Sequence, residues 1–297
     1  MRAPAPELSV VVVNYNTRDC LLDCLRSLFA NLNGIATEVF VVDNASTDGS
    51  VAAVERAFPE VRQLVNEANL GFARANNRAL RQAQGQDVLL LNPDTIVEPG
   101  AIVTLRASLR DLPGAVAVGP KVVRPDGRLD LACRRSFPRL SVALARLTGL
   151  SRVFKRSRWA GQYNRTYEDP DEMGEIDAGT AAAMYFRRSA LEAVDFFDEA
   201  FFMYGEDLDL CYRLKSNGGR IYYVPAAVVV HLKGASSRQQ ARAMLREFHR
   251  AMWLFYRKHY ATGWRGTLSP LVWSGIQLRY GLVLGLNAVR GRQVVSP

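Results

Sequence analysis

The chain has 297 residues, of which 48% are hydrophobic and 23% are charged. This composition is ordinary for a globular protein, and it excludes disordered, collagen-like and low-complexity classes. The formal net charge of +9 is unevenly distributed, because residues 131–167 carry +9, residues 233–297 carry +10 and the remainder carries −10. Two basic segments on an acidic body predict a localised anionic partner, such as a lipid surface, a phosphate-bearing substrate or nucleic acid.

The cysteines and the ends of the chain suggest a cellular compartment. Cys20, Cys24, Cys133 and Cys211 have the spacing of neither a zinc site nor a disulfide framework, so we expect reduced structural thiols, as in the cytosol. The first seven residues lack the apolar core of a secretory signal. The longest uncharged run near the C-terminus, residues 266–278, is too short to span a membrane. We therefore expect a cytoplasmic protein.

Strands and helices alternate regularly in the first half. Apolar β-branched runs predict strands over residues 8–13, 38–42, 61–65 and 88–91. Apolar residues at helical spacing predict helices over residues 17–32, 47–58, 72–83 and the segment after Pro99. This alternation predicts right-handed βαβ crossovers and a mostly parallel sheet. Ligands of such sheets bind at the carboxyl ends of the strands, where we expect the chemistry to lie.

The pattern changes after residue 115. A turn at Pro125-Asp126-Gly127 should join strands over 115–123 and 128–132, and the arginine-rich segment 133–170 should form a loop or lid. The later elements are strands over residues 181–187 and 220–230, and helices over residues 189–194, 207–216, 237–260 and 268–289. We expect a sheet-forming domain over residues 1–232 and a basic helical extension over residues 233–297.

Four polar groups follow predicted strands: Asn14-Tyr15-Asn16, Asp43-Asn44, Asn92-Pro93-Asp94 and His231. Asn and Asp are common turn residues, yet four such groups at one edge of a sheet favour a binding site. A carboxylate in a proline-fixed turn, as at Asp94, suits a divalent cation that holds phosphate oxygens. His231 could join that carboxylate on a metal such as Mn²⁺, or it could be a hydrogen-bonded structural histidine.

Two further motifs begin helices. The carboxylates of Glu206-Asp207-Leu208-Asp209 could cap a helix, but three in four residues exceed that need, and one could be a general base. Asn69-Leu70-Gly71 precedes another helix, whose free N–H groups are a weak signal for phosphate binding. The GxGxxG, GxxxxGK[ST] and GxSxG motifs do not occur, which argues against dinucleotide, P-loop and hydrolase-elbow sites.

In combination, these motifs resemble those of inverting family 2 glycosyltransferases of the GT-A fold, especially rhamnosyltransferase-like enzymes of bacterial cell-surface polysaccharide assembly. The matching runs are VVVNYN (11–16), VVDNASTDGS (41–50), NLGFARANN (69–77), LLLNPDT (89–95), DAGTAAAMYFRRSAL (177–191) and FFDEAFFMYGEDLDLCYR (196–213). The resemblance covers roughly residues 8–232. It implies an α/β domain with a Rossmann-like, mostly parallel central sheet flanked by helices, here followed by a C-terminal helical extension.

The resemblance also implies roles for particular residues. Nucleotide or donor contacts would come from Asn14, Asn16, Asp43, Asn69, Gly71, Asn92 and Gly179. Asp43 would accept a hydrogen bond from the pyrimidine N3–H, and Gly179 would let the donor phosphates or the acceptor approach. Asp94 and His231 would bind Mg²⁺ or Mn²⁺, with Asn92 replacing the first carboxylate of the family's Asp-x-Asp motif. Asp207 would be the catalytic base.

The implied reaction is a single in-line displacement of a nucleoside diphosphate by an acceptor hydroxyl. The expected donor is dTDP-L-rhamnose, with a UDP-hexose as the alternative, and the acceptor is a glycan or a polyprenyl-diphosphate-linked sugar. The resemblance therefore places the enzyme on the inner face of a bacterial plasma membrane. Residues 233–297 could contact that anionic surface, form an oligomer, or pack on the catalytic domain.

Readings from other classes are weaker. A sugar nucleotidyltransferase should have a glycine-rich basic loop after the first strand, and residues 10–16 contain neither glycine nor a basic residue. A nucleic-acid partner is not expected, because the basic residues lack an interleaved aromatic motif. A non-catalytic anionic-lipid or nucleic-acid binding protein remains the alternative from another class.

Overall fold

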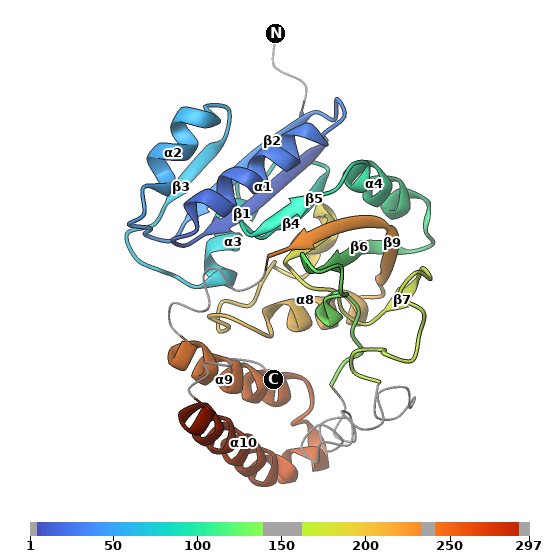
Figure 1. Ribbon diagram of the computed structural model, residues 1–297. Helices are drawn as coiled ribbons and strands as arrows, with labels where there is room; N and C mark the ends of the chain where they lie inside the picture. Colours follow the sequence, from blue (N-terminus) through green and yellow to red (C-terminus); the bar gives the residue numbers. More distant parts are fainter. Residues whose placement is uncertain (1–4, 139–161, 233–240, 291–297) are drawn as a thin grey trace.

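A computed structural model describes residues 5–138, 162–232 and 241–290 (Figure 1). Within these ranges a single sheet has nine strands in the order β3-β2-β1-β4-β8-β6-β9-β5, with β7 also paired to β9. The strands are β1 (Leu8–Asn14), β2 (Thr37–Asp43), β3 (Arg62–Val65), β4 (Asp87–Leu91), β5 (Thr95–Val97), β6 (Ala115–Val123), β7 (Gly174–Ile176), β8 (Ala183–Arg187) and β9 (Arg220–His231).

Helices connect and flank these strands. They are α1 (Arg18–Ala30), α2 (Ser50–Ala57), α3 (Phe72–Leu80), α4 (Ala101–Asp111), α7 (Arg188–Ala193), α8 (Glu206–Ser216), α9 (Ala241–His259) and α10 (Ser269–Arg290). Two short 3₁₀ helices are η1 (Leu131–Cys133) and η3 (Gly263–Leu268). The predicted α/β class is confirmed, as are the long C-terminal helices. The sheet is mixed instead of mostly parallel, because β5, β7 and β8 pair antiparallel to their neighbours.

The direction of the strands brings the predicted site residues to one edge. The pairs β1–β2, β2–β3, β1–β4 and β6–β9 are parallel, whereas β8 is antiparallel to both of its neighbours. Strands β6 and β9 therefore point the same way as β1, β2 and β4. Asn14 and Asp43 are register partners, and Asn92 directly follows β4. The carboxyl edge thus gathers these residues with His231 at the end of β9.

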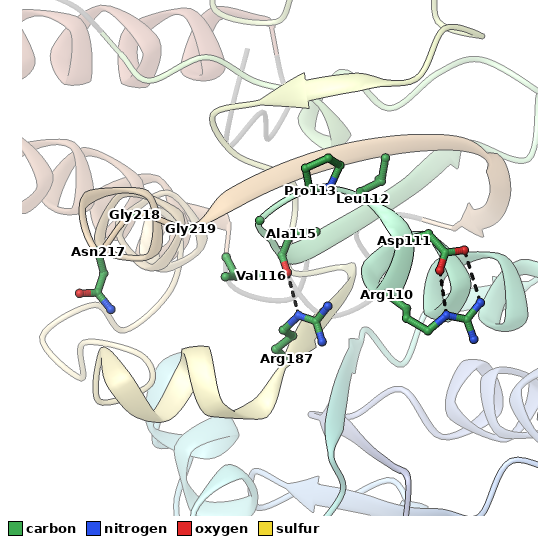
Figure 2. Close-up of a pocket in the computed structure, with 11 residues that line it drawn as sticks. Arg110, Asp111, Leu112, Pro113, Ala115, Val116, Arg187, Asn217, Gly218 and Gly219 are labelled. Atoms are coloured by element: carbon green, nitrogen blue, oxygen red, sulfur yellow. Dashed lines mark hydrogen bonds and ion pairs between the residues drawn. The ribbon is translucent and has the colours of Figure 1, made fainter.

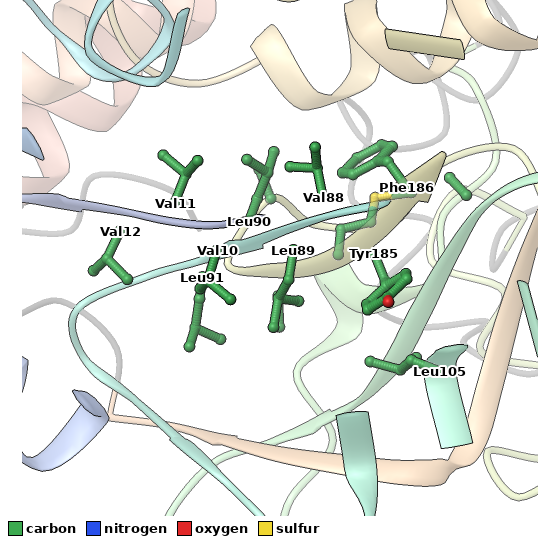
Figure 3. Packing of buried hydrophobic residues seen from close by; sticks show 14 of the residues in the cluster. Val10, Val11, Val12, Val88, Leu89, Leu90, Leu91, Leu105, Tyr185 and Phe186 are labelled. Carbon is green, nitrogen blue, oxygen red and sulfur yellow. The ribbon is translucent and has the colours of Figure 1, made fainter. Parts of the chain in front are cut away.

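The core lies on both faces of the sheet. In Figure 3, Val10, Val12, Leu89, Leu91 and Tyr185 point to the face covered by Leu105 of α4. The intervening residues Val11, Val88, Leu90 and Phe186 point to the opposite face. Burial on both faces explains why these strands are continuous apolar runs in the sequence. Each such side chain contributes about 1.5–3 kcal/mol when it leaves water.

The prediction of a strand over residues 128–132 is wrong. The segment makes one isolated bridge, between Val123 and Leu129, and then turns into η1. The Asp130 carboxylate accepts a hydrogen bond from the Ala132 amide at 3.2 Å, which stabilises a turn in place of a ladder. Strands β5 and β7 were not predicted from the sequence, and each has only three residues.

Helix α9 packs against α8 through a buried carboxylate. Asp209 lies 2.8 Å from both Arg213 Nε and Lys258 Nζ, and 2.7 Å from His259 Nε2. Burial alone would raise the pKa of Asp209, but His259, Arg213 and Lys258 lower it to about 2. Asp209 is therefore ionised at neutral pH, and it joins the C-terminal extension to the helix that begins at Glu206.

Two other features bear on the predictions. The cysteines have free thiols, and burial raises the pKa of Cys24, Cys133 and Cys211 to about 12, 11 and 12. These thiols are protonated and unreactive at neutral pH, as expected of structural cysteines. None of the described helices is both long and apolar enough to cross a bilayer.

Candidate active site

The ends of β1 and β2 are joined by buried side chains. Asn14 Nδ2 donates to Asp43 Oδ2 at 2.8 Å and to Ser46 Oγ at 3.1 Å. The other Asp43 oxygen accepts from the Ser46 amide at 2.7 Å. Asn14 and Asp43 are both buried, so in this structure they order the loop after β2. A direct contact of Asp43 with a base stays a prediction, and each carboxylate oxygen retains one further lone pair for it.

Asn16 lies at the more accessible rim of the same loop. Its amide donates to Ser46 Oγ at 2.9 Å, and its Oδ1 accepts from the Thr47 amide at 2.7 Å. The residue has a φ of 52°, which is the left-handed region that asparagine tolerates better than most residues. Asn16 therefore links the loops after β1 and β2, where a nucleotide base would bind.

Gly71 lies where two distant loops touch. Its φ is 81°, and a Cβ placed there would lie 2.4 Å from the carbonyl oxygen of Phe202. The same oxygen accepts from the Phe72 amide at 2.7 Å, and Asn69 Oδ1 accepts from the Gly71 amide at 2.9 Å. One of the N–H groups expected to bind phosphate is thus already paired. Gly71 brings the segment before α8 against the start of α3.

Asp94 and His231 lie side by side, as the prediction required. Strand β5 pairs Thr95 with His231, which places His231 Nε2 3.1 Å from Asp94 Oδ1. The other ring nitrogen lies 3.5 Å from Asp130 Oδ2. Burial would lower the pKa of His231, but the Asp130 and Asp94 carboxylates outweigh it and raise the pKa to about 9. Without a cation between them, the histidine is therefore charged at neutral pH.

These side chains fit a divalent cation. Asn92 Oδ1 is buried and has no hydrogen-bond partner in the described ranges, so it is an available oxygen donor beside Asp94. Asp130 could hold the second nitrogen of His231, which is how carboxylates orient metal-binding histidines. Across the described residues, no group of three or more His, Cys, Asp or Glu side chains could hold a metal. The set instead resembles sites that bind Mg²⁺ through one or two carboxylates and substrate phosphates.

Asp207 is paired with an arginine that the sequence did not single out. Arg135 Nη2 lies 2.6 Å from Asp207 Oδ2, and both side chains are largely buried. Asp207 Oδ1 accepts from the Leu208 amide at 2.7 Å. Arg135 also donates to the Gly179 carbonyl oxygen, and a Cβ on Gly179 would lie 3.0 Å from Met184 Sδ. Asp207 is therefore paired and oriented next to the segment that contains Gly179.

The segment from Gly179 to Ala182 connects the two parts of the site. The Ala182 carbonyl oxygen accepts from the Asn92 amide at 2.8 Å. Gly179 binds Arg135, and Arg135 binds Asp207. The carboxylate expected to be the base and the group expected to bind metal are thus attached to opposite ends of one four-residue segment.

Glu206 is a buried carboxyl next to Asp207. Its Oε2 atom has no hydrogen-bond partner among the residues described. Burial, together with the neighbouring Asp207 charge, raises the pKa of Glu206 from the ordinary 4.5 to about 8. The Glu206 carboxyl is therefore protonated at neutral pH and can donate a hydrogen bond.

This protonated carboxyl predicts a pH dependence of stability. The unfolded chain loses the Glu206 proton near pH 4.5 and the folded chain near pH 8, so the free energy of unfolding falls as pH rises through this window. Glu206→Gln should remove this loss, roughly 1 kcal/mol for each pH unit crossed. Urea unfolding at pH 5, 7 and 9 measures it, with the exposed change Glu192→Gln as the control. Parallel pH profiles for the parent and Glu206→Gln would contradict the assignment.

A cavity of the described chain lies elsewhere. It has a volume of about 570 Å³ and opens where β6 begins, at the amino edge (Figure 2). Its arginines are already paired, because Arg110 binds Asp111 and Arg187 donates to the carbonyl oxygens of Ala115 and Leu109. We assign the site by its chemistry, which lies at the carboxyl edge.

Two site residues were missed, and one interpretation of the charge pattern is corrected. Asp130 and Arg135 lie in segments that seemed to be a strand and part of a basic surface patch. Arg134 and Arg135 are in fact buried, and Arg134 donates to the carbonyl oxygens of Asp169 and Glu168. These two arginines therefore belong to the interior. Residues 139–161 of the same patch lie outside the described residues.

A mixed α/β sheet with flanking helices and with amide and carboxylate side chains at its carboxyl edge defines a protein of the Rossmann-like class, in which ligands bind at that edge. Residues 4–249 match the model of the protein family described as "Glycosyltransferase like family 2". The chain belongs to glycosyltransferase family 2, whose members depend on nucleotide sugars. The resemblance recognised in the sequence motifs is thereby confirmed.

Known proteins support this family and fold. The chain is 31% identical over 301 residues to the N-acetylglucosaminyl-diphospho-decaprenol L-rhamnosyltransferase of Mycobacterium tuberculosis, covering 96% of this chain and 95% of the relative. A mannosyltransferase from Pyrobaculum calidifontis in complex with GDP-Man and Mn²⁺ superposes with a TM-score of 0.59 at 19% identity, covering 96% and 80% of the two chains. GalNAc-T7 with UDP, GalNAc and Mn²⁺ also gives a TM-score of 0.59, at 15% identity and 87% and 50% coverage. The two structures show a GT-A-like fold.

Proposed function

We propose that this enzyme transfers L-rhamnose from dTDP-L-rhamnose to a polyprenyl-diphosphate-linked sugar, with inversion at the anomeric carbon. The observation that carries the reaction is the arrangement at the carboxyl edge. Asp94 lies beside His231, and the Asn92 amide and the Arg135–Asp207 pair contact opposite ends of the segment Gly179–Ala182. The choice of sugar and acceptor is supported by the relative that is similar over 96% of the chain.

The donor would bind across the ends of β1, β2 and β4. Asn16 and Asn69 are the accessible amides at this edge, and buried Asn14 and Asp43 hold the loop that carries Ser46. The backbone there is fixed before the donor arrives, which reduces the entropy lost on binding. Thymine and uracil share the N3–H group, so this part of the site favours a pyrimidine without separating dTDP-rhamnose from UDP-hexoses.

Asp94 and His231 would hold a divalent cation, Mg²⁺ or Mn²⁺, with Asn92 as a further oxygen donor. Such a cation, when bound, neutralises charge that develops on the leaving diphosphate. The protein's own part is to position both ligands, because β5, which directly follows Asp94, pairs with β9 at His231, and the Asp130 carboxylate lies 3.5 Å from His231 Nδ1. A His231 charged near neutral pH must lose a proton to bind metal, so donor binding should release protons.

Asp207 would act as the general base. It takes the proton of the acceptor hydroxyl while that oxygen forms a bond to the anomeric carbon and the bond from carbon to the diphosphate oxygen breaks. Arg135 and the Leu208 amide each use one lone pair of the carboxylate, so both oxygens can still accept a proton. Glu206, protonated beside it, could donate a hydrogen bond to the incoming acceptor.

We also propose where the enzyme works and how the chain is divided. Residues 1–232 would form the catalytic domain and residues 233–297 an extension that meets the membrane. A lipid-linked acceptor would place the enzyme in the cytoplasm, peripheral to the inner face of a bacterial plasma membrane.

The direct test is a transfer assay with the full chain. The enzyme should move labelled rhamnose from dTDP-L-rhamnose to a polyprenyl-diphosphate-linked N-acetylglucosamine in the presence of Mg²⁺ or Mn²⁺. UDP-hexoses and GDP-mannose serve as competing donors. Transfer from a UDP-hexose but not from dTDP-L-rhamnose would show that the donor sugar is a hexose. A lack of transfer from any of these donors would contradict the proposal.

Asp94→Asn should weaken metal-dependent donor binding by about 10–100-fold, because a metal ligand of full charge is replaced by a neutral amide. Calorimetry of donor binding with Mg²⁺ and again with a chelator measures this effect. The chelator should weaken binding by the parent and change little in the variant. Asp126→Asn, in an exposed turn, is the matched control. Unchanged affinity in Asp94→Asn would exclude Asp94 as a ligand.

A further inference from the structure

Helix α10 is the outermost helix of the described chain, with α9 between it and α8 (Figure 1). Its inner side packs on α9. Ile276 is buried, and Arg279 Nη1 lies 3.0 Å from His249 Nε2. The Tyr280 ring contacts the His249 ring at a centroid distance of 5.2 Å. These contacts fix which side of α10 faces outward.

The outward side of α10 carries an apolar stripe. Its members are Leu271, Leu278, Leu282 and Val289, whose spacings of seven, four and seven residues align them on one side of a helix. They are 72%, 66%, 60% and 87% exposed, so no other described part of the chain covers them. Glycines 275, 281 and 285 have open space around them, which keeps this surface smooth. A continuous exposed apolar stripe of this kind marks an interaction surface.

The charge of α9, η3 and α10 indicates the kind of partner that the stripe would bind. Residues 241–290 contain eight Lys or Arg and one acidic residue, Glu247, which is paired with Arg250. Arg242, Arg246 and Arg250 follow one another at spacings of four along α9, and all three are exposed. Arg238, which would extend this row, lies outside the described residues. In η3, Trp264 is 73% exposed next to exposed Arg265. Apolar, aromatic and basic side chains in combination suit an anionic lipid surface.

We propose that α10 lies in the plane of an anionic membrane and inserts the stripe Leu271, Leu278, Leu282 and Val289 between the lipid headgroups. The helix cannot cross the bilayer while it stays attached to α9, because Arg279 in its middle is bound to His249. A position in the plane of the membrane suits both sides of α10, because the apolar stripe leaves water and Arg279 stays bound to His249.

A second copy of this chain fits the exposed stripe of α10 less well than an anionic lipid surface does. In a twofold dimer the same surface faces itself, so the excess positive charge of the extension would be brought against an identical positive charge. The described part of the extension has no acidic partner for its basic side chains besides Glu247. An anionic lipid surface neutralises these charges, whereas self-association concentrates them.

The lipid contact deepens, and rests on, the proposed transfer to a lipid-linked acceptor. Helix α9 joins the membrane-facing helix to the catalytic one, because Asp209 of α8 binds Lys258 and His259. A Cβ on Gly205, just before α8, would lie 3.3 Å from the Ala251 Cβ. Insertion of α10 would therefore set the position of Asp207 relative to the headgroups, where an acceptor diphosphate lies.

Co-sedimentation with vesicles tests this surface in the full chain. With vesicles of phosphatidylcholine and phosphatidylglycerol at 3:1, Leu278→Glu combined with Leu282→Glu should lower the partition coefficient at least tenfold. The matched control is Gln277→Glu combined with Ala288→Glu, which adds the same charge at exposed positions on another side of α10. The control should keep most of the binding. Both variants should bind the nucleotide-sugar donor as the parent does.

Three outcomes would overturn the assignment. The first is equal vesicle binding by the stripe variant and its control. The second is equal binding by the parent to vesicles of phosphatidylcholine alone, which would remove the role of charge. The third is a parent dimer that binds no vesicles and that the stripe variant dissociates, since the stripe would then be a self-association surface. Intact vesicle binding without any sugar transfer would instead count against the proposed function alone.

Discussion

Asp207→Asn is expected to lower turnover by about 10²–10⁴-fold while the affinity for the nucleotide-sugar donor stays unchanged. The amide keeps the size of the side chain and can still accept from the Leu208 amide, but it cannot take the acceptor's proton. Single-turnover transfer assays measure the loss, and calorimetry measures donor affinity. The effect should appear in kcat more than in the KM of the donor.

The control for this variant is Asp111→Asn. Asp111 is an exposed carboxylate paired with Arg110 at the amino edge of the sheet, so the same chemical change there should leave turnover within twofold of the parent. Near-normal turnover in Asp207→Asn would remove Asp207 from the role of base. A loss of donor affinity as large as the loss of turnover would point to a misfolded site.

Arg135→Met should lower the free energy of unfolding by about 3–5 kcal/mol, because it leaves the buried Asp207 carboxylate without its cation. Turnover should fall as well, since the carboxylate loses the group that orients it. Urea unfolding measures stability, and the transfer assay measures turnover. Arg134→Met is the matched control, because Arg134 is also buried but contacts carbonyl oxygens of Glu168 and Asp169 and the Tyr223 ring instead of a carboxylate.

The double variant Arg135→Met with Asp207→Asn separates the ion pair from simple packing. Once Asp207 is neutral, removing the arginine no longer leaves an unpaired charge. The second substitution should therefore cost at least 1 kcal/mol less than it does in the parent, a coupling within the usual range of about 0.5–3 kcal/mol for contacting residues. Strictly additive costs would show that Arg135 stabilises the fold without stabilising the Asp207 charge.

The elements that the sequence predicts well are those with local causes. Strands β1, β2 and β4 are buried on both faces, so their apolar runs are visible in any window of six residues. Their parallel alignment follows from the helices between them, and it places Asn14, Asp43 and Asn92 at one edge without further information. The position of His231 beside Asp94 does not follow from the sequence alone, because the pairing of the unpredicted strand β5 with β9 brings the two side chains together.

The elements that were missed depend on contacts between residues distant in the chain. Arg135 and Asp207 are 72 residues apart, and one arginine among the nine basic residues of segment 131–167 has no local signature of burial. Asp130 was assigned to a strand because alternating apolar residues surround it, whereas its side chain caps a turn. The local pattern of apolar residues in the sequence shows which side chains are buried. A buried ion pair can be recognised only when the positions of both partners in the fold are known.

The Asp209 contact changes how the boundary after residue 232 should be understood. That boundary separates the family's motifs from the basic extension, yet two of the three side chains that bind the Asp209 carboxylate, Lys258 and His259, come from beyond it. A chain ending at residue 232 would leave this fully buried carboxylate with Arg213 alone and would uncover the surface beside Gly205. The extension therefore stabilises helix α8 through these contacts. The whole described chain should unfold as one cooperative unit.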